Sequence, residues 1–162
     1  MVKRCVTCKT TGSVHETRER YVDEFPLSDG TKLKFVFEDF PQEVCSKCGE
    51  RYVGPEAIAA ERAVTRELIA RQIRDRAVFK WFRKSAGFKA AELANLLGVT
   101  PETISHWENG HTEPTRTMWA IMDALVEDEI EGRTTTLDRL RAPAGSRIPK
   151  RPVRLSLKAA NG

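Results

Sequence analysis

Hydrophobic and polar residues alternate in the first third of the chain and recur with a helical period after it. Residues 13–22 and 31–37 alternate, and residues 28–30, Ser-Asp-Gly, form a turn signal between them. In the second stretch Leu33, Phe35 and Phe37 fall on one side, and Lys32, Lys34 and Val36 fall on the other. A period of two is typical of strands with one buried face. The pattern therefore predicts a small antiparallel sheet near the N-terminus.

From residue 55 onward, apolar residues recur every three or four positions, as on one face of a helix. A first helix is predicted from Glu56 to about Ile73, with Pro55 suited to its first turn. The apolar side changes at residues 74–76, Arg-Asp-Arg, so we expect a kink or break there and separate cores on either side. The arginines of this run are interpreted as a solvated helix face.

All four cysteines lie in two Cys-x-x-Cys pairs, Cys5/Cys8 and Cys45/Cys48. Four thiolates at these spacings can close one tetrahedral zinc site. A redox dithiol or a disulfide is the alternative, but a redox motif uses one pair near a βαβ pattern, and disulfides form in oxidising compartments. We therefore predict one structural Zn²⁺ per chain. Because so small a sheet buries little, folding of this part should depend on the metal.

Several function classes are disfavoured. Four cysteines leave no open coordination position for a catalytic water, and no His-Glu-x-x-His, Gly-x-Ser-x-Gly or phosphate-cradling loop occurs, so an enzyme is not predicted. His15 lies in an alternating strand and is interpreted as a surface histidine. The chain has neither an apolar signal region nor eighteen consecutive apolar residues, so we expect a cytoplasmic protein without membrane contact.

Charge is unevenly distributed along the chain, whose net charge is +4. Residues 84–131 hold three basic and nine acidic side chains, whereas residues 132–162 hold eight basic and one acidic. Residues 55–83 are also basic, with seven basic and four acidic side chains. If nucleic acid is the partner, the basic segments would supply sequence-independent attraction that weakens with salt.

Residues 89–109 carry the pattern of a helix-turn-helix. Such a unit needs a small residue where two helices cross, a glycine in the turn and apolar residues beyond it. Ala94, Gly98, Ile104 and Trp107 occupy these places. An ordinary helical hairpin is the alternative interpretation, but the complete string of matches favours DNA binding. The segment resembles the phage-repressor (XRE/Cro) class of helix-turn-helix domains.

This resemblance implies a first helix over 75–86, a scaffold helix over 90–97 and a recognition helix over 101–109. A closing helix is predicted over 115–131 from its apolar periodicity. Six residues near the polar side of the recognition helix are candidates for reading DNA: Thr100, Glu102, Thr103, Ser105, His106 and Asn109. Four others lie at loop or helix-start positions suited to phosphate contacts: Lys89, His111, Thr115 and Arg116.

The recognition helix has unusual chemistry for a DNA reader. Glu102 can accept a hydrogen bond from cytosine N4 but is repelled by phosphate, whereas His106 can donate to guanine N7 or contact a phosphate. Either side chain could equally be a bystander. Arginine, the residue that most often reads guanine, is absent from this helix.

The order of the parts predicts an α+β fold, with a β-rich zinc-binding domain followed by an all-α repressor-like helix-turn-helix domain. We divide the chain into a four-cysteine zinc domain (1–54), a helical linker (55–74), a helix-turn-helix domain (75–131) and a flexible basic tail (132–162). In the tail, Val153, Leu155 and Leu157 alternate and either form a short added strand or belong to an unstructured segment.

Over residues 1–131 this order resembles the MqsA-type antitoxins and the related YgiT-type zinc-finger/helix-turn-helix proteins. The resemblance implies that the zinc domain neutralises a ribonuclease toxin, and that the C-terminal domain dimerises on a palindromic operator in double-stranded DNA and represses its own operon. The family's best-known members read bases with an asparagine and an arginine where this chain has Glu102 and His106, so a different operator is expected. The alternative is a stand-alone zinc-finger/helix-turn-helix regulator without a toxin.

Overall fold

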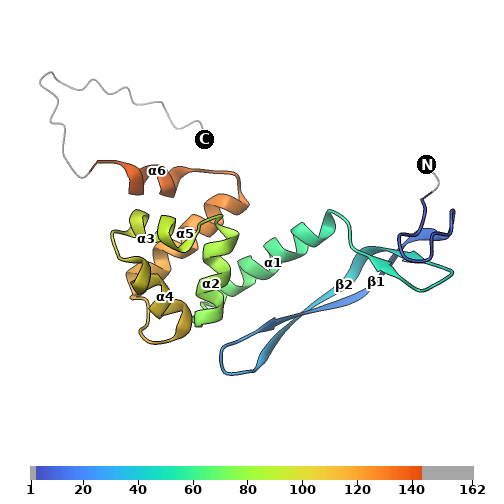
Figure 1. The fold of residues 1–162 in the computed structure, drawn as a ribbon, viewed down its shortest axis with the longest axis horizontal. Coiled ribbons are helices and arrows are strands. Elements are labelled where there is room, and N and C mark those ends of the chain that lie inside the picture. The colour runs from blue at the N-terminus through green and yellow to red at the C-terminus, as the bar shows by residue number, and fades with distance from the viewer. Residues whose placement is uncertain (1–2, 144–162) are drawn as a thin grey trace, which may run out of the picture.

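The computed structural model describes residues 3–143 and has an elongated shape, with a sheet at one end and a group of helices at the other (Figure 1). The elements in chain order are β1 (Val14–Pro26), β2 (Lys32–Cys45), β3 (Arg51–Tyr52), α1 (Glu56–Ala70), α2 (Arg76–Ser85), α3 (Ala90–Leu97), α4 (Pro101–Asn109), α5 (Arg116–Ile130) and α6 (Thr135–Arg141). The predicted α+β fold is confirmed. None of the helices in the described residues is long and apolar enough to cross a membrane.

The three strands form one antiparallel sheet in the order β1-β2-β3, in which β1 and β2 make a long hairpin. The hairpin pairs Val14 with Cys45 at one end and Pro26 with Lys32 at the other. Both strands are longer than predicted, and their register shifts once. The polar residues 38 and 39 of β2 lie opposite the single residue Arg20 of β1, between the pairs Glu19–Phe40 and Tyr21–Phe37. A bulge of this kind lets a strand continue although the alternation of its side chains is interrupted.

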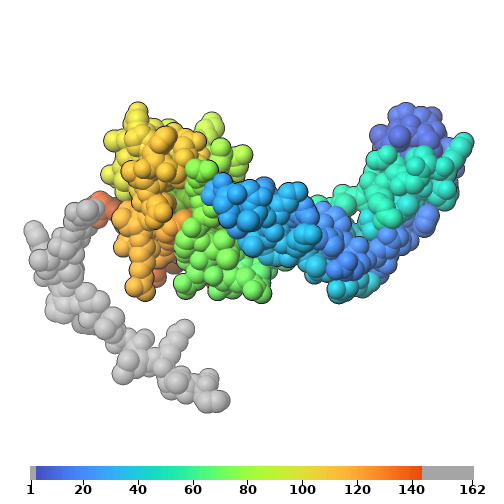
Figure 2. All heavy atoms as spheres, turned by 90° about the horizontal axis from the view of Figure 1, so that it is seen from below, coloured from blue at the N-terminus to red at the C-terminus, as the bar shows by residue number. Residues whose placement is uncertain are grey.

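The tip of the hairpin packs into the helical part. Phe25 is 8% exposed and belongs to the same hydrophobic core as Val64 of α1 and Phe79 of α2. Its ring meets Trp81 edge-on with ring centres 5.5 Å apart. Figure 2 shows the hairpin, in blue, lying directly against the helices. The expectation of separate cores is therefore wrong, because the long strands carry an apolar end as far as α2.

The helical core is built around two aromatic residues of α2. Phe79 is fully buried and contacts Trp107 of α4 and Trp119 of α5 edge-on, with ring centres 5.5 and 5.4 Å apart. Phe82 is also fully buried and meets Trp119 edge-on, with ring centres 6.3 Å apart. Aromatic edge-to-face contacts add to the burial of apolar area. They fix the angles at which α4 and α5 cross α2.

The predicted break between the first two helices is confirmed. α1 ends at Ala70, three residues earlier than expected, and α2 begins at Arg76. Gln72 has a positive φ of 52°, a backbone conformation incompatible with a continuous helix. Asp75 then caps α2 by accepting a hydrogen bond from the backbone N–H of Ala77 at 2.8 Å.

The arginines at this break are exposed, as interpreted, but they also make specific contacts within the fold. Arg74 donates to both carboxylate oxygens of Asp123 at 2.8 and 2.6 Å, and its guanidinium lies 4.9 Å from the centre of the Trp119 ring. The fork of donors on arginine suits a carboxylate and an aromatic face at once. These contacts attach the connection between α1 and α2 to α5.

The basic extension begins with a helix, so the prediction of a flexible tail from residue 132 is wrong for α6. Asp128, which is 6% exposed, accepts hydrogen bonds from the backbone N–H of Thr136 at 2.6 Å and from Arg133 Nε at 3.0 Å. These donors, the Thr136 N–H foremost, lower the pKa of Asp128 below its ordinary value. Leu137 and Leu140 pack against the core. The strand considered at residues 153–157 lies outside the described residues.

Replacing Phe25 tests whether the hairpin and the helices share one core. Phe25→Ala should lower the free energy of unfolding by about 3 kcal/mol, because it removes a buried ring from the contact with Trp81. Urea unfolding followed by tryptophan fluorescence measures the change. Val22→Ala is the matched control, since Val22 lies on the same strand but is 38% exposed, and it should change stability by less than about 0.5 kcal/mol. Equal effects of both substitutions would contradict a shared core.

Candidate metal centre and nucleic-acid interface

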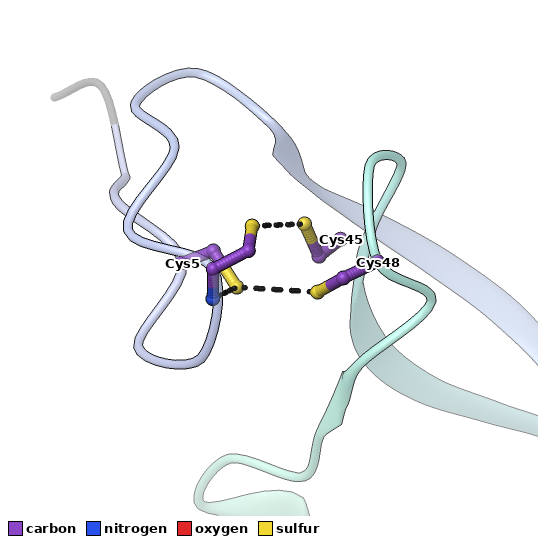
Figure 3. Close-up of side chains that lie close together, drawn as sticks. Cys5, Cys45 and Cys48 are labelled. Atoms are coloured by element: carbon purple, nitrogen blue, oxygen red, sulfur yellow. Dashed lines mark hydrogen bonds between the residues drawn. The ribbon is translucent and has the colours of Figure 1, made fainter.

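The four cysteines meet at the end of the hairpin that lies far from the helices. Two loops supply them, one before β1 and one directly after β2, and Figure 3 shows Cys5, Cys45 and Cys48 turned toward one another across the gap between these loops. The Sγ atoms of Cys5 and Cys48 are 3.6 Å apart, and those of Cys8 and Cys45 are 3.7 Å apart. All four sulfur atoms lie within 4.8 Å of one another. The structure therefore brings together every predicted metal ligand.

These distances fit a tetrahedral metal ion. Sulfur atoms about 2.3 Å from a central Zn²⁺ are separated by about 3.8 Å along each edge of the tetrahedron. The observed separations of 3.6 and 3.7 Å agree with that edge. They are far longer than the bond of about 2.0 Å in a disulfide. The geometry is that of a four-cysteine metal site with all four positions supplied by the protein.

The two cysteine loops share one backbone design. In each, the residue after the second cysteine donates its N–H to the carbonyl of the first: Lys9 to Cys5 at 3.0 Å and Gly49 to Cys45 at 2.9 Å. Both residues have positive φ, 60° for Lys9 and 74° for Gly49. Glycine adopts this conformation without steric cost, whereas lysine does not. The first loop therefore has the same turn as the second despite its lysine.

Hydrogen bonds prepare two of the thiols to ionise. The Tyr52 hydroxyl lies 3.0 Å from Cys5 Sγ and lowers the pKa of Cys5 to about 6, in spite of the burial of this thiol. The Ser13 hydroxyl, 3.2 Å from Cys45 Sγ, likewise lowers the pKa of Cys45. Thiolates are the metal-binding form of cysteine. Tyr52 belongs to β3 and was missed by the sequence reasoning, because nothing in the spacing of the cysteines indicates a tyrosine partner.

The thiol of Cys48 resists ionisation in the absence of a cation. The backbone N–H of Glu50 lowers the pKa of Cys48, but desolvation and the hydrogen bonds that Cys48 shares with the other three thiols raise it to about 12. Several thiolates so close together repel one another, and a bound divalent cation relieves this repulsion. The donor set therefore fits a metal ion better than it fits four free thiols.

A serine substitution tests the metal site. Cys45→Ser should reduce the bound zinc of the purified protein from one ion per chain to nearly none, because the buried Cys45 is one of four ligands and oxygen is a poorer donor to zinc at such a site. Elemental analysis measures the zinc content. Ser46→Ala, which changes an exposed neighbour in the same loop, should keep the full content. A Cys45→Ser protein that retains one zinc ion would rule out this ligand set.

The helix-turn-helix consists of α3, α4 and the turn between them. Gly98 ends α3 with a positive φ of 67°, and the backbone N–H of Val99 then donates to the Ala94 carbonyl at 3.0 Å. The Thr100 hydroxyl caps α4 by accepting from the Thr103 N–H at 3.2 Å. α3 and α4 have the predicted bounds, so the turn glycine and the cap of α4 lie where the pattern placed them. Ala94 is 1% exposed at the crossing of the two helices.

Comparison with known proteins agrees with this geometry. Residues 79–124, which run from α2 into α5, match the family model described as Helix-turn-helix. This segment is an XRE-type helix-turn-helix domain. It is the double-stranded DNA-binding domain of a transcription regulator, and its family is generally non-enzymatic. Comparison with curated proteins gave no match to the chain.

The predicted DNA-reading residues lie together on the exposed side of the domain. Five of them are exposed: Thr100, Glu102, Ser105, His106 and Asn109. Thr103 is half-buried. Of the predicted phosphate contacts, His111 lies beside His106 with ring centres 5.4 Å apart, whereas Lys89 and Arg116 are exposed at the starts of α3 and α5. The contacts of these residues with DNA stay predictions.

Two of these side chains are already occupied by local hydrogen bonds. Asn109 donates its amide to the Ser105 carbonyl at 2.8 Å and to the Ser105 hydroxyl at 3.2 Å, so this pair forms a joint polar surface. The pKa of Glu102 is lowered by its own backbone N–H and then by the Thr100 hydroxyl. Glu102 is therefore a carboxylate at neutral pH, at the end of α4 that approaches DNA in this class of domain.

Two charged residues of the helical core were missed by the sequence reasoning. Arg83 of α2 donates to both carboxylate oxygens of Glu108 of α4, at 2.5 and 3.2 Å, and to the Phe88 carbonyl at 2.7 Å. The two charged side chains are 11% and 10% exposed. Their positions near the polar sides of amphipathic helices gave no signal that they pair. The ion pair fixes the C-terminal end of the recognition helix to α2.

Proposed function

We propose that the protein is a sequence-specific repressor that binds a palindromic operator as a homodimer. The observation that carries this proposal is the exposed polar surface of α4 within a matched helix-turn-helix domain. A dimer would place two such helices on half-sites about 34–36 Å apart, one turn of DNA. We infer that Zn²⁺ fills the four-cysteine site, one ion per chain, because the four-sulfur donor set and its spacing suit zinc.

The roles of the candidate residues follow from their chemistry and place. Glu102 accepts from a cytosine N4 amino group, and His106 donates to guanine N7, each from the exposed side of α4. The paired side chains of Ser105 and Asn109 offer further polar contacts to base edges. Thr100 and Thr103 offer hydroxyls to base edges from the N-terminal end of α4. The predicted phosphate contacts come from the loop after α4 and the starts of α3 and α5: Lys89, His111, Thr115 and Arg116.

We also propose that the zinc end binds a protein partner, a ribonuclease toxin as in the antitoxin family that the chain resembles. The zinc site and α4 lie at opposite ends of the molecule, so a partner at the zinc end leaves α4 free (Figure 1). The zinc end offers exposed apolar residues: Val6 in the first cysteine loop is 68% exposed, and Val53 directly after β3 is 41% exposed. In functional terms we keep the division into a zinc part (1–54), a linker (55–74) and a DNA-binding part (75–131).

Operator binding can be tested by gel shift with the DNA upstream of the protein's own gene. Arg116→Ala should weaken binding to all sequences alike and reduce the salt dependence by about one phosphate contact. Glu102→Gln should instead relax the preference for cytosine at one base pair, because an amide can donate as well as accept. Lys47→Ala, an exposed lysine in the second cysteine loop, is the control and should change neither property. Equal binding of the wild type to random DNA would refute an operator-specific repressor.

Toxin binding can be tested with the product of the adjacent gene. If that product is a ribonuclease, the protein should inhibit its RNA cleavage. Val53→Asp should abolish the inhibition, because it places a charge on an exposed apolar residue of the zinc end. His106→Ala, at the other end of the molecule, should inhibit like the wild type. An operator-binding protein with no such neighbour and no inhibition would support the stand-alone regulator instead.

A further inference from the structure

Hydrogen bonds from Ser28 join the tip of the β1–β2 hairpin to the start of α2. Ser28 donates its backbone N–H to the two carboxylate oxygens of Asp75 at 3.2 and 3.3 Å, and its hydroxyl donates to the same carboxylate. Asp75 also caps α2 through the Ala77 N–H. One carboxylate thus holds both the hairpin tip and the first turn of α2. The hairpin cannot move away from α2 without exposing these donors.

The next residue connects this junction to the recognition helix. Arg76 donates from Nη1 to the Asn109 carbonyl at 3.0 Å and from Nη2 to the Ser28 carbonyl at 3.3 Å. The Asn109 carbonyl belongs to the last turn of α4, where the partial negative charge of the helix end favours a cation. The two donors of one planar guanidinium therefore bridge the hairpin and the C-terminal end of α4.

Gly110 shows how closely Arg76 approaches the recognition helix. This residue ends α4 with a positive φ of 76°, a conformation that favours glycine. A Cβ at this position would also lie 2.5 Å from Arg76 Nη1. The backbone turn thus favours glycine here, and a larger residue would displace the guanidinium that is packed on it.

A buried contact supports the same connection. Phe25 near the hairpin tip packs on Trp81 of α2, and Arg83 of α2 pairs with Glu108 of α4. α2 therefore holds the hairpin at one surface and the recognition helix at another. The bridge through Arg76 joins the two at the end of α4, where Asn109 and the neighbouring His111 are candidate DNA contacts.

The far end of the hairpin is part of the metal centre. β2 ends in Cys45 itself, and β1 begins at Val14, which pairs with Cys45. Loss of the metal would free this end of the sheet, because the metal would no longer join the loop before β1 to the end of β2. The hairpin would then be held only by its tip. An isolated two-stranded hairpin is marginally stable in water.

We propose that Arg76 is a positioning residue for the recognition helix, and that through it the metal state of the four-cysteine site sets operator affinity. This inference rests on the proposed operator binding. The metal-loaded hairpin presents the Ser28 carbonyl to Arg76, which in turn holds the last turn of α4. When the metal is removed, the hairpin tip loosens, Arg76 loses one of its two anchors, and the end of α4 frays.

The experiment compares operator binding of the full-length protein with Zn²⁺ and after removal of the metal with EDTA. The wild type should bind about tenfold more weakly without metal, a typical coupling between two sites. Arg76→Ala should bind about tenfold more weakly even with Zn²⁺, and EDTA should weaken it little further. Arg76→Lys should restore only part of the affinity, since one ammonium lacks the fixed fork of donors. Arg71→Ala, which removes an exposed arginine paired only within α1, should behave as the wild type.

A second measurement does not depend on DNA. Hydrogen exchange at the backbone amides of residues 107–111 should rise in the wild type on addition of EDTA, and should already be high in Arg76→Ala with Zn²⁺. Circular dichroism confirms that each variant keeps its helices. If the wild type binds no operator but shows this exchange pattern, the proposed function fails while the connection stands. Metal-independent exchange in the wild type, or an Arg76→Ala protein that still responds fully to EDTA, would overturn the inference.

Discussion

The hairpin of β1 and β2 buries too little surface to be stable by itself, so other parts of the protein must hold both of its ends. The arrangement of the metal site and of the helices depends on this constraint. One end is closed by four sulfur atoms gathered within 4.8 Å, and the other by Phe25 against Trp81 and by Ser28 against Asp75. Two strands alone bury too little apolar surface to offset their conformational entropy. The helical core therefore stabilises one end of the hairpin, and a metal ion in the four-cysteine site would stabilise the other.

Those features of the fold that depend on neighbouring residues were predicted from the sequence. The bounds of α3 and α4 follow from the small residue, the turn glycine and the threonine cap, all within about ten residues of each other. The true length of β2 was missed, because Glu38 and Asp39 interrupt the alternation, and the bulge that they form opposite Arg20 becomes visible only when the two strands are paired. The contact of Phe25 with Trp81 was missed for a similar reason, since no local pattern joins residues so far apart.

The candidate sites likewise contain residues that the sequence predicted and residues that it did not. The metal ligands could be found because cysteine is rare and its spacing matches a known coordination geometry, whereas Tyr52, which acts on Cys5, comes from a separate strand. The arginines at the break between α1 and α2 were interpreted as solvated because charged runs usually are. In the structure Arg74 binds Asp123 and Arg76 binds the carbonyl of Asn109. Charge alone does not distinguish a free arginine from one whose partner is distant in the sequence.

The ion pairs of its acidic residues also change how the net charge of the helix-turn-helix region is interpreted. Residues 84–131 hold nine acidic and three basic side chains, which by itself argues against a DNA-binding surface. Three of the acids are paired with arginines inside the fold: Glu108 with Arg83, Asp123 with Arg74 and Asp128 with Arg133. Two of these arginines lie before residue 84 and the third lies after residue 131, so the segment count omits them. The surface charge near α4 is therefore less negative than the sequence count, and Glu102 is the acid on α4 that DNA would meet.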